Sequence, residues 1–179
     1  MPARATRGGM AEEPVHVVPY DPSWPRRFEE ERVRLAEVLA PWLAGPIEHV
    51  GSTAVPGLAA KPVIDVMAGV ASLEASRPAI EALARHGWCY FPYRPESMHW
   101  LCKPSPMART HHLHLVPFGG ALWAERLAFR DHLRTHPDMA LEYAALKREL
   151  AERYRLDREA YTEAKGPFVA RVVAAAMGR

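Results

Sequence analysis

The stretch EHVGSTAVPGLAAKPVIDVMAGV, from Glu48 to Val70, decides the fold. Its two apolar runs, 47–50 and 62–70, predict short β-strands, and the glycines, proline and small polar residues between them predict a loop over 51–61. Asp65 lies inside the second run, where an unpaired carboxylate is costly to bury. Two interpretations stay open for Asp65: a structural carboxylate held by backbone amides or a basic side chain, or a metal ligand or general base.

The loop opens with Gly51-Ser52, a pair suited to binding a phosphate group. Glycine allows close backbone approach, adjacent amides can point at an anion, and the serine hydroxyl adds a donor. Lys61 at the end of the loop supplies a positive charge. Most Gly-Ser pairs are ordinary turns, so the pair gains meaning only from the Asp65 that follows.

The flanking sequence predicts a mixed set of strands and helices. An edge strand is expected over 15–19, and Ser23 is expected to cap a helix that runs from Arg26 to about Leu39. Downstream, Gly87 is expected to end a helix over 75–86. Further strands are expected at 88–93, 98–103 and 111–117.

From Ala121 onward glycine and proline nearly vanish, and apolar residues recur every three or four positions. This pattern predicts helices over 121–134, 139–154 and 158–176. A strand-rich half followed by a helical half indicates an α+β fold. With 179 residues we expect one domain over 14–179, preceded by a disordered tail over 1–13.

Composition excludes several functional classes. The 23 basic and 21 acidic side chains nearly balance, so a general nucleic-acid or membrane partner is not expected. The sequence has no apolar stretch of the ~20 residues that a membrane helix needs. Only two cysteines are present, without metal-binding spacing, which fits a reducing compartment, and we expect a cytoplasmic protein. The sequence favours no particular oligomeric state.

The segment Thr110 to Val116 holds three of the 9 histidines. In a strand, His112 and His114 project from one face while the leucines between and after them pack on the other. Two imidazoles on one face can bind a divalent metal or a phosphate, and Asp65 can complete the set. His49 is a further candidate. The alternative is that these are partly buried histidines bonded to backbone carbonyls.

Five segments together resemble the GrpB family: Tyr20-Asp-Pro-Ser-Trp-Pro25, the run from Glu48 to Asp65, His112-Leu-His114, Phe129-Arg-Asp-His-Leu-Arg134 and Tyr161-Thr-Glu-Ala-Lys165. That family is similar to nucleotidyltransferases in fold and also occurs fused to some dephospho-coenzyme A kinases. The resemblance implies a nucleotidyltransferase-like mixed sheet flanked by helices, with a nucleotide or phosphorylated small molecule as partner.

The resemblance also implies roles for individual residues. Asp65, His112 and His114 would hold a divalent metal (Mg²⁺, Mn²⁺ or Zn²⁺), with Asp65 and His114 catalytic. Substrate would be bound by His49, Gly51, Ser52, Thr53, Lys61, Arg130 and Lys165. For Arg130 and its helix neighbours, the alternative is a solvated face with weak salt bridges.

One position departs from the nucleotidyltransferase pattern. Active members of that superfamily usually carry a second acid two residues after the first, and here that residue is Met67. A thioether is a poor ligand for Mg²⁺. Three hypotheses therefore stay open: a divergent metal-dependent nucleotidyltransferase, a catalytically degenerate nucleotide-binding or regulatory module, and a protein-interaction domain.

Overall fold

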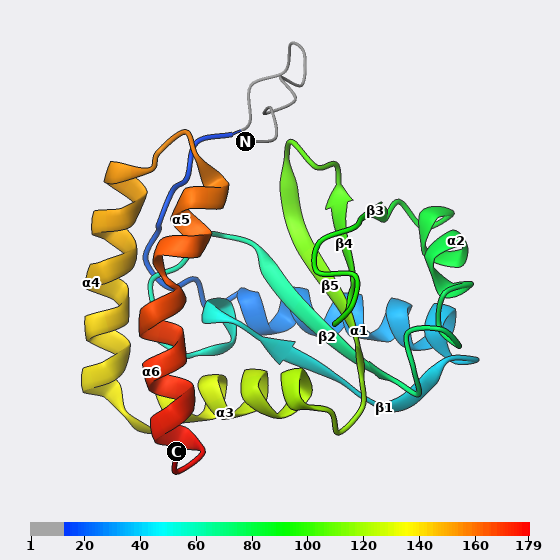
Figure 1. Cartoon of the computed structure of the whole chain (residues 1–179). Helices are drawn as coiled ribbons and strands as arrows, with labels where there is room; N and C mark the ends of the chain where they lie inside the picture. Colours follow the sequence, from blue (N-terminus) through cyan, green and yellow to red (C-terminus); the bar gives the residue numbers. More distant parts are fainter. Residues whose placement is uncertain (1–12) are drawn as a thin grey trace, which may run out of the picture.

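One mixed sheet of five strands forms the centre of the molecule (Figure 1). The structure is a computed structural model and describes residues 13–179. In chain order the strands are β1 (Leu43–Val50), β2 (Ile64–Val70), β3 (Cys89–Phe91), β4 (His99–Pro104) and β5 (Arg109–Pro117). In space their order is β1-β2-β5-β4-β3, with β2 and β5 parallel and every other pair antiparallel.

Each face of the sheet packs against its own helices. Helices α1 (Trp24–Leu39) and α2 (Ala79–Ala84) cover the face that carries Val66, Leu113 and Leu115. Helix α3 (Ala121–Thr135) covers part of the other face, where the side chains of Met67, Trp100 and Val116 lie. Because side chains alternate along a strand, this division assigns a face to every strand residue. We call these faces the α1 face and the α3 face.

Three C-terminal helices lie to one side of the sheet, against α3 and the loop over 51–61 (Figure 1). They are α4 (Pro137–Arg153), α5 (Arg158–Ala164) and α6 (Gly166–Ala176). The rings of Tyr143 and Phe168 stack at 4.8 Å between α4 and α6, in one cluster with Val55 and Leu58 of the Gly51–Lys61 loop. The loop is therefore packed between the sheet and the helical half.

The fold class predicted from the sequence, α+β, is confirmed. Two predicted elements are wrong. The segment 15–19 is not a strand, because only Val18 pairs, in a single bridge with Ala60. The helix expected over 158–176 is two helices, because Pro167 has no N–H to continue the hydrogen-bond ladder and the helix is interrupted at Lys165.

Two helix boundaries also differ from expectation. The Ser23 side chain does not cap α1; instead the Asp21 carboxylate accepts a hydrogen bond from the Ser23 amide at 2.8 Å. Helix α2 begins only after Pro78 and ends before Gly87, which has a φ of 81°. The tail expected over 1–13 lies outside the described residues except for Glu13. Within 13–179, none of the helices is both long and apolar enough to cross a membrane.

Candidate functional site

The parallel pair β2 and β5 brings Asp65, His112 and His114 together. Asp65 is the register partner of His112, and Met67 is the partner of His114. All four side chains therefore project from the α3 face. The sequence pattern puts the histidines on one face of a strand, and the parallel register sets that face beside the carboxylate.

The imidazole rings of His112 and His114 both face one carboxylate oxygen of Asp65. Oδ1 of Asp65 lies 3.0 Å from Nδ1 of His112 and 3.4 Å from Nε2 of His114. One candidate ligand atom from each residue lies within 4.8 Å of the other two. The Asp65 side chain is 27% exposed and those of His112 and His114 are 14% and 6% exposed, so solvent reaches the cluster mainly at the carboxylate.

The protonation states of Asp65, His112 and His114 at neutral pH are those that can bind a cation. Burial lowers the pKa of His114 to about 3 and also lowers that of His112. Burial alone would raise the pKa of Asp65, but hydrogen bonds from the two imidazoles outweigh it and hold that pKa well below its usual range. At neutral pH the cluster is thus two neutral imidazoles and a carboxylate, the forms in which these groups bind metals.

The chemistry of the cluster fits a transition-type divalent ion. Two imidazoles and one carboxylate suit Mn²⁺ or Zn²⁺ better than Mg²⁺, which prefers oxygen ligands. Nε2 of His112 is buried and has no hydrogen-bond partner among residues 13–179, so the protein alone does not satisfy this ring. Met67 is fully buried beside His114, and the cluster offers one carboxylate where a two-metal site needs more.

Gly51 allows the loop to approach Asp65. Its backbone has φ 72° and ψ −170°, a region that is essentially restricted to glycine. A Cβ atom at this position would lie 2.6 Å from Oδ2 of Asp65. The glycine is therefore required both by the turn and by the carboxylate next to it.

Two lysines stand beside the cluster on the side of the C-terminal helices. Nζ of Lys61 lies 5.0 Å and Nζ of Lys165 lies 4.4 Å from the centre of the Tyr161 ring. Burial lowers the pKa of Lys61 to about 7 and that of Lys165 to about 8, while the charge of Asp65 acts in the opposite direction on both. Neither lysine forms an ion pair with any described residue. Two neighbouring ammonium groups without a carboxylate partner are suited to bind an anion.

The hydroxyl groups of the Gly51–Lys61 loop are engaged within the protein. The Ser52 side chain lies near the buried Tyr143 hydroxyl and acts to lower its pKa, although burial has the larger effect and raises it. The Thr53 hydroxyl lies 2.9 Å from Nε2 of His49. Ser52 begins the short 3₁₀-helix Ser52–Ala54, so this segment is a packed turn.

His49 and Arg130 lie outside the cluster. His49 pairs with Val66 in the β1–β2 register, projects from the α1 face, and stacks on Phe28 with ring centres 4.7 Å apart. Arg130 donates to Glu48 at 2.7 Å, to the His49 carbonyl at 3.0 Å and to Asp131 at 2.7 Å. Stacking, hydrogen bonds and ion pairs engage both side chains, and their roles in substrate binding stay predictions.

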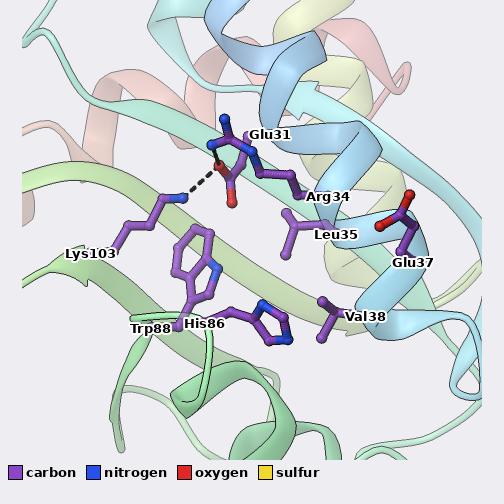
Figure 2. Close-up of a pocket in the computed structure, with 8 residues that line it drawn as sticks. All are labelled: Glu31, Arg34, Leu35, Glu37, Val38, His86, Trp88 and Lys103. Atoms are coloured by element: carbon purple, nitrogen blue, oxygen red, sulfur yellow. Dashed lines mark hydrogen bonds and ion pairs between the residues drawn. The ribbon is translucent and has the colours of Figure 1, made fainter.

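A separate hollow of about 190 Å³ lies on the α1 face (Figure 2). The Lys103 ammonium reaches across it to the Glu31 carboxylate at 2.5 Å, with the Trp88 ring alongside (Figure 2). Lys103 pairs with His111, whose side chain points away from the Asp65 face. The ion pair fills the polar end of this hollow, which is not part of the candidate site.

Sequence reasoning did not find Arg126. This residue lies on α3, and its Nη2 is 3.7 Å from the sulfur of Met98, which in turn is 3.4 Å from Nδ1 of His114. Arg126 precedes Arg130 and Arg134 at intervals of four, so the predicted helix already put all three on one side. Only the crossing of α3 over the sheet distinguishes Arg126 as the one beside the histidines.

Comparison with known proteins places the chain among bacterial relatives. It is 41% identical over 169 residues to a UPF0157 protein of Pseudomonas aeruginosa, a match that covers 91% of this chain and 68% of that protein. It is 31% identical to a dephospho-CoA kinase of Mycolicibacterium paratuberculosis, over 89% of this chain but only 45% of the kinase.

A solved structure and a family match agree with these relatives. The crystal structure of the conserved protein GrpB from Enterococcus faecalis superposes with a TM-score of 0.82 at 33% identity, covering 91% of this chain and 98% of that one. The family described as GrpB protein matches residues 14–175, and the chain therefore belongs to the GrpB family.

Proposed function

We propose that the protein binds one divalent cation through Asp65, His112 and His114 and holds a phosphate-bearing small molecule against it with Lys61 and Lys165. The observation that carries the proposal is the proximity of these two groups. A carboxylate and two neutral imidazoles lie within 4.8 Å, and beside them are two lysines that form no ion pair with an acidic residue of 13–179. A metal and two ammonium groups together form a site for a multiply charged anion.

The cation that fits this site is Mn²⁺ or Zn²⁺, since two of the three ligand atoms are imidazole nitrogens. When bound, such an ion neutralises phosphate charge and orients the phosphate group. Lys61 and Lys165 hold the anion. The ring of the fully buried Tyr161, which both ammonium groups contact, orients the two lysine side chains.

The ligand that we propose is a nucleotide, on the strength of the nucleotidyltransferase-like arrangement of strand, loop and acid. Phosphate chemistry also agrees with the kinase name of the mycobacterial relative, although the chain matches less than half of that protein. The thiols of Cys89 and Cys102 are both free, in keeping with a cytoplasmic site of action.

Met67 favours binding over transfer. It occupies the position of a second acid and is fully buried, so it cannot support a second metal. The same site can therefore serve a single-metal nucleotidyltransferase or a nucleotide-binding module, and pyrophosphate release separates the two.

The test combines metal binding with nucleotide chemistry. Mn²⁺ affinity is measured by calorimetry for the wild type, Asp65→Asn, and Asp138→Asn, which removes an exposed carboxylate on α4 as a charge-matched control. We expect Asp65→Asn to weaken Mn²⁺ binding by about 100-fold or more and Asp138→Asn to leave it unchanged.

The three proteins are then incubated with labelled nucleoside triphosphates and Mn²⁺. Metal-dependent binding with pyrophosphate release supports the transferase, and binding without release supports the module. A wild-type protein that binds neither Mn²⁺ nor any nucleotide would refute the proposal and favour the protein-interaction domain.

A further inference from the structure

Arg126 is a cation without a matching anion. Its Nε atom is buried with no hydrogen-bond partner, and its only hydrogen bond to a described residue goes to the Met98 sulfur, at 3.7 Å. A thioether is a weak acceptor, whereas a guanidinium offers five donors. Within residues 13–179 no carboxylate lies in ion-pair range of this side chain. Arg126 thus has most of its donor capacity free next to the candidate metal cluster.

Arg126 and the two lysines lie at opposite ends of that cluster. The Met98 sulfur connects Arg126 to Nδ1 of His114, and the charge of Arg126 helps to lower the pKa of His114. At the other end, the charge of Lys61 helps to lower the pKa of His112. Two residues of a β-strand span about 7 Å. A ligand that carries a chain of phosphates can place one phosphate group at each end of such a site.

The β3–β4 connection contributes the other groups that face Arg126. The charge of Arg94 lowers the pKa of Arg126, while Tyr93 and Asp65 act in the opposite direction, after the larger effect of burial. Arg94 has a φ of 50°, and its carbonyl accepts hydrogen bonds from the amides of Ser97 and Met98 at 2.9 and 3.2 Å. This turn holds Arg94 where its charge acts on Arg126.

We infer that Arg126 forms a second anion-binding subsite, which takes a further phosphate group of the ligand that Lys61 and Lys165 hold at the other end of the Asp65 cluster. The inference rests on the proposed function and narrows its substrate to compounds that carry a chain of phosphates. Arg126 is then a residue that selects for the length of that chain.

The test compares anions of increasing length. Affinities for inorganic phosphate, pyrophosphate and tripolyphosphate are measured by calorimetry, with Mn²⁺ in excess so that each anion is present as its Mn²⁺ complex. Wild type is compared with Arg126→Gln, with Arg126→Lys, and with Arg85→Gln, which removes an exposed arginine at the C-terminal end of α2 as a charge-matched control.

We expect the wild type to bind tripolyphosphate about 10-fold or more tighter than phosphate, as an added charge-assisted hydrogen-bond pair predicts. Arg126→Gln should lose that preference and keep its affinity for Mn²⁺ and for inorganic phosphate. Arg126→Lys should keep part of the preference, and Arg85→Gln all of it. Thermal unfolding of each variant checks that the fold is retained.

Two results would overturn the inference. If Arg126→Gln keeps the full preference for tripolyphosphate, Arg126 is not a subsite, while the proposed metal and phosphate site stands. If the wild type shows no preference for longer chains, the narrowed substrate class is wrong even where Mn²⁺ and phosphate bind. Failure of the wild type to bind Mn²⁺ and phosphate at all refutes the proposed function and the inference together.

Discussion

Replacing Gly51 by alanine should lower the free energy of unfolding and also weaken metal binding at the candidate site. The residue has φ 72° and ψ −170°, and a side chain in this region costs about 1–3 kcal/mol of stability. The new Cβ would lie 2.6 Å from Oδ2 of Asp65, where ordinary contact begins at 3.4 Å. The carboxylate therefore has to withdraw by about 0.8 Å, the difference between these distances, while metal ligands tolerate about 0.2 Å.

Gly57 provides the matched control. It has a φ of 80°, but a Cβ there would meet nothing within 4 Å. Gly57→Ala should therefore lose only the backbone term, about 1–2 kcal/mol. Gly51→Ala should lose about 2–4 kcal/mol, which for a chain of this size lowers the unfolding midpoint by roughly 5–15 °C.

Urea unfolding and Mn²⁺ calorimetry on the two variants separate strain from displacement of the carboxylate. We expect Gly57→Ala to bind Mn²⁺ like the wild type and Gly51→Ala to bind it at least about 10-fold more weakly. Equal Mn²⁺ affinities in two folded variants would show that the close approach of Gly51 to Asp65 does not matter for the metal, and the reasoning would be wrong.

Three further substitutions test buried or half-buried charges of the protein. Burial lowers the pKa of Lys147 to about 6, so between pH 6 and 10 the unfolded chain binds a proton at this lysine that the folded chain lacks. Lys147 should therefore make the free energy of unfolding rise with pH by up to about 1.4 kcal/mol per unit. In urea titrations at pH 6.5 to 8.5, Lys147→Met should remove this contribution and leave those of Lys61 and Lys165. Lys103→Met leaves the buried Glu31 without its nearest cation and should cost about 3 kcal/mol, most of it recovered when Glu31 is also replaced by Met. Arg130→Met should lower the unfolding temperature without changing Mn²⁺ affinity, and a large loss of metal binding would return Arg130 to the site.

Local sequence patterns predicted the parts of the site that depend on local geometry. Alternation in a strand is enough to put His112 and His114 on one face, and the apolar run around Asp65 marks its carboxylate as one that needs a partner. The same rule excludes His49 once the register is known. Val50 pairs with Asp65, and His49, one residue out of phase, faces the opposite side.

Such local patterns could not predict contacts between distant segments of the chain. The resemblance suggested Lys165, but its place next to Lys61 depends on how α5 and α6 dock on the loop, and no periodicity encodes that. The helical pattern also did not predict the interruption at Lys165 between α5 and α6, although Pro167 is visible in the sequence. Arg126 and Arg130 look alike as helical arginines. Only the way α3 crosses the sheet sets Arg130 against the Glu48 carboxylate and Arg126 against Met98, next to His114.

The near balance of 23 basic and 21 acidic residues hides an uneven pairing. On the helices, arginines such as Arg26, Arg32 and Arg85 find a glutamate three or four residues away. Among residues 13–179, Asp65 is the carboxylate whose charge acts on Lys61, Lys165 and Arg126, and it already accepts hydrogen bonds from two imidazoles. Holding unpaired cations so close together costs stability, because burial and mutual repulsion both oppose their charge. An anionic ligand bound among these cations offsets that cost. Binding of the ligand should therefore raise the free energy of unfolding by stabilising this part of the protein.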